Sequence, residues 1–227
     1  MRLAAFVTLA VLSLGVALYA VGAYGLLPLG TLVHPDMRAA FRAHPIGIYT
    51  HVFASVVALA LGPFQFSSRL RASRIQLHRF SGRAYLGVGV LFGGLAGLYM
   101  SLHAFGGIAS QLGFGCLALA WLFTGLRAFL AIRRHDVATH RRWMVRNFAL
   151  TFAAVTLRLY LPASMAAGIA FELAYPVIAW LCWVPNVVVA EVLFNLTHDA
   201  SSQPRAGGRP APAAELNRQA PPTDRNF

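Results

Sequence analysis

Lysine is absent from this sequence, and acidic residues are scarce. Only 7 of the 227 residues are Asp or Glu, against 19 arginines, and all charged residues together make up 11% of the chain. Soluble domains average about 25% charged residues, so a sizeable soluble domain is excluded. Because 58% of the residues are hydrophobic, the composition is typical of a protein that crosses a membrane several times.

Cysteine occurs twice, at Cys116 and Cys182, and both residues lie within hydrophobic runs. This pattern excludes a disulfide framework, and no CxxC or CxxCH motif occurs. The HExxH, P-loop, GxGxxG and GxSxG motifs are also missing. The sequence therefore offers no recognisable catalytic motif, and it leaves open whether the protein is an enzyme.

The net charge of +12 is carried entirely by arginine. In a soluble protein this charge would suggest nucleic-acid binding. Here the arginines lie between hydrophobic runs that are long enough to span a bilayer. Membrane topology and contact with anionic lipids explain them better, and no nucleic-acid partner is expected.

Six hydrophobic runs are long enough for a crossing of about 20 residues. We therefore predict an all-α polytopic membrane protein with six transmembrane helices and a central four-helix core. The predicted helices are residues 4–26, 47–66, 84–103, 111–132, 147–167 and 174–196.

Three regions are predicted along the chain. Residues 1–30 hold an N-terminal transmembrane helix, which is too long for the hydrophobic region of a cleaved signal peptide. Residues 31–198 hold the other five helices. Residues 199–227 form a tail rich in Pro, Ala and Arg, with too few hydrophobic residues to fold.

Arginine placement predicts the orientation in the membrane. The loops 67–83 and 133–146 carry five arginines each, whereas the loops between the other helix ends carry only Arg38 and Arg42. Basic loops remain in the cytoplasm. Both termini and the two basic loops are therefore predicted to be cytoplasmic.

The same two basic segments also contain candidate ligand-binding residues, because each precedes a predicted helix. Cations at a helix N-terminus oppose the helix dipole, and they make sense there if an anion binds between them. The anion would be a lipid phosphate, a haem propionate, or a substrate carboxylate or phosphate. The alternative is anchoring to lipid head groups, with Trp143 at the interface. The candidates are His78, Arg79, Arg83, His140, Arg142 and Arg146.

Arg158 lies in the middle of the fifth hydrophobic run, where a charge costs roughly 2.5–3.5 kcal/mol on insertion scales. At 1.5 Å per residue, Asn186 has the same depth, and Arg127 has the depth of Glu191. We therefore predict two polar layers, Arg158 with Asn186 and Tyr160, and Arg127 with Glu191. Such layers either fix the helix register or line a path for a ligand or protons.

Four histidines lie near the predicted membrane surfaces, His51 and His103 on the outer side and His78 and His140 on the inner side. Paired histidines across a helical bundle hold b-type haem through axial imidazoles. These four are therefore candidate haem-iron ligands. The alternative is that each is a hydrogen-bonded residue at the membrane rim, since His78 and His103 are about 37 Å apart along a continuous helix.

Glycine recurs at every fourth position in the third hydrophobic run, at Gly89, Gly93 and Gly97. This spacing lets a neighbouring helix or a flat cofactor approach closely.

Four segments carry a family resemblance: GPFQF (62–66), HRFSGRAYL (78–86), HRRWMVRNFALTFAAVTLRLYLP (140–162) and WVPNVVVAE (183–191). Together they resemble the bacterial predicted membrane proteins grouped as domain of unknown function 2306, over about residues 47–194. The resemblance implies an integral protein of the bacterial inner (cytoplasmic) membrane and no particular activity. The residues to which it draws attention are His78, Arg79, Gly82, Arg83, His140, Arg141, Arg142, Trp143, Arg158, Pro185, Asn186 and Glu191.

A second, weaker resemblance is to the di-haem b-type transmembrane cytochromes, whose four-helix core holds histidines at two levels. This chain departs from that pattern, because its inner histidines precede the predicted helices.

Two functions follow from these observations. The first is a basic, cytoplasm-facing cavity in the membrane that binds a small anionic or amphipathic ligand through Arg158, Arg146, His78 and His140, with haem b as a candidate cofactor and electron transfer as a candidate role. The alternative is a non-redox carrier or accessory membrane subunit, whose arginines only set topology and bind lipid.

Overall fold

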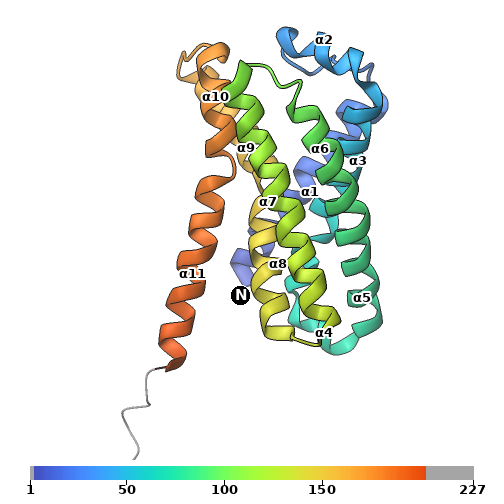
Figure 1. Cartoon of the computed structure of the whole chain (residues 1–227), viewed down its shortest axis with the longest axis vertical. Coiled ribbons are helices and arrows are strands. Elements are labelled where there is room, and N and C mark those ends of the chain that lie inside the picture. Colours follow the sequence, from blue (N-terminus) through green and yellow to red (C-terminus); the bar gives the residue numbers. More distant parts are fainter. Residues whose placement is uncertain (1–2, 203–227) are drawn as a thin grey trace, which may run out of the picture. The chain divides into compact units, whose positions relative to one another are not determined.

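Six helical stretches long and apolar enough to cross a membrane make up most of the computed structural model, which describes residues 3–202 and side chains as far as residue 194. Figure 1 shows them as a set of helices, and the described residues contain no strand. The prediction of an all-α polytopic membrane protein is confirmed. The six stretches are Leu3–Leu26, Pro45–Phe66, Ile75–Ser101, Gly107–Arg133, Val137–Ala166 and Phe171–Phe194.

Several stretches consist of more than one helical element. Two elements, η1 and η3, are π-helical, and η2 is a 3₁₀ turn. The elements are α1 (Leu3–Val21), η1 (Gly22–Leu26), α2 (Pro35–Ala43), α3 (Pro45–Leu61), η2 (Pro63–Phe66), α4 (Ser68–Ser73), α5 (Ile75–Ala84), η3 (Tyr85–Phe92), α6 (Gly93–Ser101), α7 (Gly107–Arg133), α8 (Val137–Thr151), α9 (Ala153–Ala166), α10 (Phe171–Leu181) and α11 (Val184–Ser202).

Residues 1–192 form one compact unit, and residues 193–227 form a second. Within the second unit, residues 193–202 belong to α11. The predicted tail, residues 199–227, lies almost wholly outside the described residues.

All six spans begin earlier than predicted, and two of them begin earlier by a wide margin. The third span begins at Ile75 instead of residue 84, and the fifth begins at Val137 instead of residue 147. Hydropathy marks where a helix becomes apolar, whereas backbone hydrogen bonding continues into the charged turns before it. Asp136 caps α8 by accepting a hydrogen bond from the Thr139 N–H at 2.9 Å, which holds the pKa of this carboxyl below its usual value. The prediction that the inner histidines precede their helices is therefore wrong.

The helix α2 was not predicted, because its nine residues are too few for a membrane crossing. It lies between two His-Pro steps, His34-Pro35 and His44-Pro45. A residue before proline is pushed out of the helical region, and proline suits the first helical position. The same dipeptide therefore ends one segment and starts the next helix at both places.

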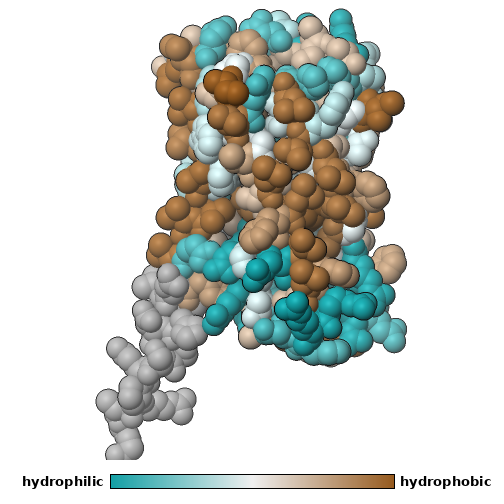
Figure 2. Space-filling view, viewed as in Figure 1, coloured by the Kyte–Doolittle hydropathy of each residue, from teal (hydrophilic) through white to brown (hydrophobic). Residues whose placement is uncertain are grey.

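The two ends of the first unit differ in charge. The basic end, as we call it, holds nine arginines in or beside α4, α5, the end of α7 and the start of α8: Arg69, Arg71, Arg74, Arg79, Arg83, Arg133, Arg134, Arg141 and Arg142. The opposite end holds α2 and is called the α2 end. Figure 2 shows hydrophilic residues gathered at the lower end, where α4 and α5 lie, and hydrophobic residues over the middle.

Spans two to five share one hydrophobic core, in agreement with the predicted four-helix core. Its buried residues include Ala58 of α3, Tyr85 of η3, Trp121 of α7 and Met144 of α8. Helices α3 and η3 approach so closely that a Cβ atom on Gly89 would lie 2.8 Å from the Cβ of Ala58. The glycine spacing of the third span thus serves contact between helices here.

A hydrogen-bonded network lies inside this core, centred on Asn147. The Asn147 carbonyl oxygen accepts from the Tyr85 hydroxyl at 2.7 Å, and its amide donates to the Trp121 carbonyl and the Thr124 hydroxyl, both at 2.8 Å. The Thr151 hydroxyl lies 2.7 Å from that of Tyr85 and accepts from the Trp121 indole at 2.9 Å. All five side chains are buried. The network joins η3, α7 and α8 without leaving Asn147 unsatisfied.

We predict that Tyr85→Phe lowers the free energy of unfolding by about 1–2 kcal/mol, because it leaves the Asn147 carbonyl oxygen without its donor. Unfolding of the purified protein in detergent micelles, followed by circular dichroism, would measure the change. Tyr160→Phe is the matched control, since Tyr160 is 38% exposed, and it should change stability by less than about 0.5 kcal/mol. Equal losses in the two variants would contradict a stabilising role for the network.

Candidate functional site

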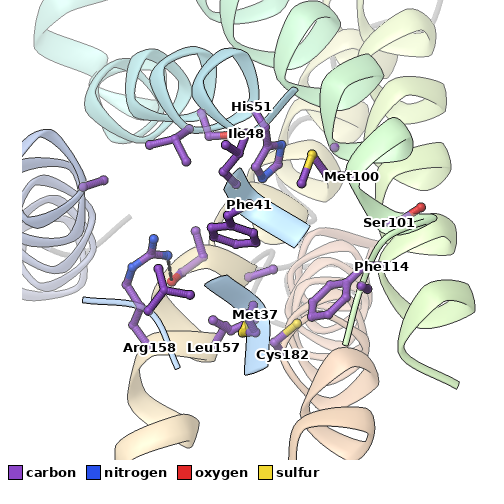
Figure 3. A pocket seen from close by; sticks show the side chains of 18 of the residues that line it. Met37, Phe41, Ile48, His51, Met100, Ser101, Phe114, Leu157, Arg158 and Cys182 are labelled. Carbon is purple, nitrogen blue, oxygen red and sulfur yellow. Dashed lines mark hydrogen bonds between the residues drawn. The ribbon is translucent and has the colours of Figure 1, made fainter. Parts of the chain in front are cut away.

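A cavity of about 630 Å³ lies between the helices towards the α2 end. All six spans contribute residues to its walls, and α2 with the loop before it forms the cover. Figure 3 shows His51 of α3, Arg158 of α9 and Phe41 of α2 among the side chains that line it. The volume is within the range of about 300–1,000 Å³ that is usual for small-molecule sites.

Two charged side chains line the cavity, Arg158 of α9 and Asp36 of α2. Arg158 Nη1 donates to the carbonyl oxygen of Ala154, one turn earlier in α9, at 3.0 Å. Its guanidinium carbon lies 5.6 Å from the centre of the Tyr19 ring. Among the described residues no carboxylate forms an ion pair with it. The guanidinium therefore keeps most of its five N–H donors available inside a membrane span.

Other polar groups line the same cavity on α1, η1 and α3. Tyr19 and Tyr24 lie on the wall that also carries Arg158, and Ser55 lies on α3. The Ser55 hydroxyl is buried and makes no hydrogen bond to any described residue. An unsatisfied buried hydroxyl costs free energy, so this atom is a natural position for a polar ligand atom.

The predicted layer of Arg158 with Asn186 and Tyr160 is wrong. The Asn186 amide donates to the Thr156 hydroxyl at 3.0 Å and to the carbonyl of Cys182 at 2.9 Å. On α9, Thr156 and Arg158 are two residues apart and thus about 200° apart around the helix. Because Thr156 faces α11, Arg158 faces the other way, and Tyr19 takes the place predicted for Tyr160.

The predicted pair of Arg127 with Glu191 is also wrong. Glu191 accepts two hydrogen bonds from Arg146, one from Nε and one from Nη2 at 2.8 Å. Arg127 instead lies against Trp143, with its guanidinium carbon 5.1 Å from the ring centre. Arg146 reaches the level of Glu191 because α8 starts at Val137, so Arg146 lies nine residues inside the helix. Counting residues along the helix does not show which way the side chain of Arg127 points, and this direction separates it from Glu191.

The other candidates at the basic end do not line the cavity. Arg79, Arg83 and Arg142 are exposed. His140 Nδ1 is bonded to the carbonyl of Ala128 at 2.8 Å, and His78 Nδ1 is buried without a hydrogen bond among the described residues. Of the predicted site residues, Arg158 and the two outer histidines, His51 and His103, line the cavity, so the cavity lies at the end opposite to the basic one predicted.

Two of the four candidate haem ligands, His51 and His103, line the cavity, and His78 and His140 lie outside it. His51 packs against Gly97, with Nδ1 2.8 Å from the Gly93 carbonyl oxygen, and His103 stacks on His44 at 3.7 Å. These contacts give no support to haem ligation.

The glycine face of the third span lies against side chains of neighbouring helices. A Cβ on Gly93 would meet Trp121 and Ser55, and a Cβ on Gly97 would meet His51. Gly93 and Gly97 also border the cavity. No group of three or more His, Cys, Asp or Glu residues that could hold a metal ion occurs in the part of the chain that the structure describes.

Sequence reasoning missed the tyrosines of the first span and the cover of the cavity. Tyr19 and Tyr24 are hydroxyl-bearing residues in a hydrophobic run, which is a usable signal for an inward-facing polar wall. The repeated His-Pro step was the signal for α2. Neither feature belongs to the segments that carried the family resemblance.

The fold and this cavity define an integral membrane protein with six candidate spans. The sequence profile of the family described as Predicted membrane protein (DUF2306) matches residues 48–194, and the chain belongs to this family. The match includes His51, Arg158, Asn186 and Glu191 and leaves out α1 and α2. Neither a curated protein nor a solved structure matches the chain.

We predict an energetic coupling between Arg146 and Glu191 of about 0.5–1 kcal/mol in a double-mutant cycle, because the pair is bidentate and partly exposed. The cycle uses Arg146→Gln and Glu191→Gln, with unfolding in detergent as the measurement. The matched cycle with Arg127→Gln and Glu191→Gln should give a coupling near zero. A coupling of Glu191 with Arg127 and none with Arg146 would contradict the ion pair seen in the structure.

Proposed function

We propose that the cavity binds a small amphipathic molecule, with its anionic head group at Arg158 and its hydrocarbon part along the apolar wall. The observation that carries the proposal is the guanidinium of Arg158, which lines the cavity within a membrane span and has no carboxylate partner among the described residues. A charge at this depth costs roughly 2.5–3.5 kcal/mol. A bound anion offsets that cost.

The wall chemistry narrows the class of ligand. Guanidinium binds carboxylate and phosphate groups through two parallel hydrogen bonds, and Tyr19 and Tyr24 add aromatic rings with hydroxyl groups beside it. Most of the remaining wall consists of apolar side chains such as Leu157, Val56 and Met165. A carboxylate with a hydrocarbon chain is the simplest molecule that matches both parts.

The proposed role is that of a ligand-binding carrier or accessory protein of a bacterial inner membrane. We infer that the basic end faces the cytoplasm, because arginine-rich loops are retained there. The cavity would then lie towards the outer surface, away from the basic loops. A haem-dependent electron-transfer role finds no support in the positions of the histidines.

We predict that the protein in lipid nanodiscs binds a fluorescent fatty acid about tenfold more tightly than the alcohol of the same chain length, because only the acid pairs with Arg158. Arg158→Met should abolish this preference, while binding of the alcohol stays nearly unchanged. Fluorescence titration measures both dissociation constants. Arg127→Met, which removes an arginine from the membrane-exposed surface, is the matched control and should keep the preference.

Two results would contradict this proposal. One is equal affinity for the acid and the alcohol in the unmodified protein. The other is a b-type absorption band on reduction of the purified protein, since a haem would then occupy the space assigned to the amphiphile.

A second proposal concerns Arg127, and it is that an anionic phospholipid head group binds at the basic end. Arg127 is exposed and lies six residues before the end of α7, about 9 Å into the span. Its guanidinium lies over Trp143 and Phe123, and it lines a hollow of about 190 Å³ together with Arg134 and Asp136, so that two cations and one carboxylate face the hollow. An exposed arginine at this depth matches the level of lipid phosphates.

We predict that Arg127→Gln lowers the affinity for phosphatidylglycerol about fivefold, the effect of one arginine near an anionic surface. Native mass spectrometry of the protein with defined mixtures of phosphatidylglycerol and phosphatidylethanolamine would measure it. Arg133→Gln removes an exposed charge from the same helix, outside the hollow, and should have a smaller effect. If the two variants behave alike, the arginines contribute only general attraction to the membrane.

A further inference from the structure

The cavity is covered at the α2 end by one continuous segment, residues 32–43, which consists of the end of a loop and α2. Its cavity-lining residues include Leu32, His34, Met37 and Phe41. Positions 37 and 41 are one helical turn apart, so one face of α2 faces the cavity. None of the α2 residues is buried. The cover therefore rests on the bundle, and near its α3 end Phe41 packs against the buried cluster of Ala20, Ile48, Val52 and Met100.

One end of the cover is tied firmly to the bundle. His44 ends α2 with φ −125° and ψ 53°, and Pro45 starts α3 directly after it. The His44 ring stacks on His103 at 3.7 Å, and its Nδ1 lies 2.7 Å from the Tyr99 hydroxyl. These contacts hold the junction of α2 with α3 in place, and the non-helical residue between two helices provides a natural pivot.

The other end of the cover has a single prominent contact. The His34 ring stacks on Phe171 at the start of α10, with ring centres 3.8 Å apart and planes 13° apart. Phe171 is buried, whereas the His34 side chain keeps 27% of its surface exposed. The preceding loop contains Gly30 at φ +93°, a conformation that glycine adopts readily. This end can therefore separate from α10 when one stack is broken.

The cover itself behaves as a unit. Arg38 Nε donates to the carbonyl of Val33 at 3.2 Å, which joins the loop to the first turn of α2. Asp36 lies 3.5 Å from His34 within the same segment. Motion would therefore displace the whole segment instead of unravelling it.

We propose that residues 32–43 form a lid on the cavity, which turns about His44 and is held closed by the stack of His34 on Phe171. The proposal rests on the proposed ligand-binding function and adds the route of access, from the aqueous side of the α2 end. Segments with few buried contacts open locally at far lower free energy than the core. The ring stack then sets how often the lid opens.

The test measures the access of a small reagent to the cavity without any ligand. Cysteine is introduced by Ser55→Cys, on the cavity wall beneath the lid, after the native thiols are removed by Cys116→Ser and Cys182→Ala. A neutral, water-soluble methanethiosulfonate is added to the protein in nanodiscs, and the rate of modification is followed by mass spectrometry.

His34→Ala should raise the modification rate about twofold to tenfold, the range that one aromatic stack contributes. His34→Phe keeps a ring over Phe171 and should stay within about twofold of the parent rate. Leu102→Ala is the control, because Leu102 is an exposed residue of the α2 end that does not line the cavity. Equal modification rates in the parent protein and in all three variants would contradict the lid proposal.

A second measurement separates this proposal from the ligand-binding one. With the fluorescent fatty acid, His34→Ala should speed both association and dissociation. One distinguishing result is that the unmodified protein fails to bind the fatty acid while the rate of cysteine modification still depends on His34. That result contradicts the ligand proposal and supports the lid. The opposite result is that binding depends on Arg158, but His34→Ala changes neither the rate of cysteine modification nor the rates of fatty-acid association and dissociation. That result contradicts the lid and supports the ligand site.

Discussion

A polar group inside a lipid bilayer has no water to bond to, and the packing of this bundle depends on meeting that requirement at Asn147. The side chain of Asn147 is fully buried and finds all its partners on η3 and α7. Interhelical hydrogen bonds in membranes are individually modest, yet this set specifies which faces of three spans meet. The glycine contact of η3 with α3 then brings the fourth helix of the core into place.

Arg158 meets this requirement only in part, and it lines the cavity. Its guanidinium lies over the Tyr19 ring of α1, and the hydrogen bond recorded for it among the described residues goes to the Ala154 carbonyl of α9 itself. The space beside it is closed at one end by the core network and covered at the other by α2. An incompletely satisfied cation, an apolar chamber and a lightly attached cover are the parts that a site for an amphipathic anion needs.

Much of the fold was predictable because a hydrophobic run of about 20 residues is stable as a membrane-spanning helix and in few other structures. Six spans were expected and six were found, and Arg158 was expected to face inward and does so. The helix starts at Ile75 and Val137 were not predictable from hydropathy, because charged turns remain helical outside the apolar stretch. Helix α2 was not predicted because it is amphipathic and has only nine residues.

By its composition and run lengths alone, the sequence determined the number of spans, the basic end and the presence of a charge at mid-membrane depth. Only the tertiary structure decided the partners of the polar residues. Depth along a helix follows from counting residues, but the direction of a side chain depends on how each helix is rotated against its neighbours. That rotation is set by contacts between residues far apart in the chain, such as Tyr85 with Asn147, and it turned Arg146 to Glu191 and Arg158 to the cavity.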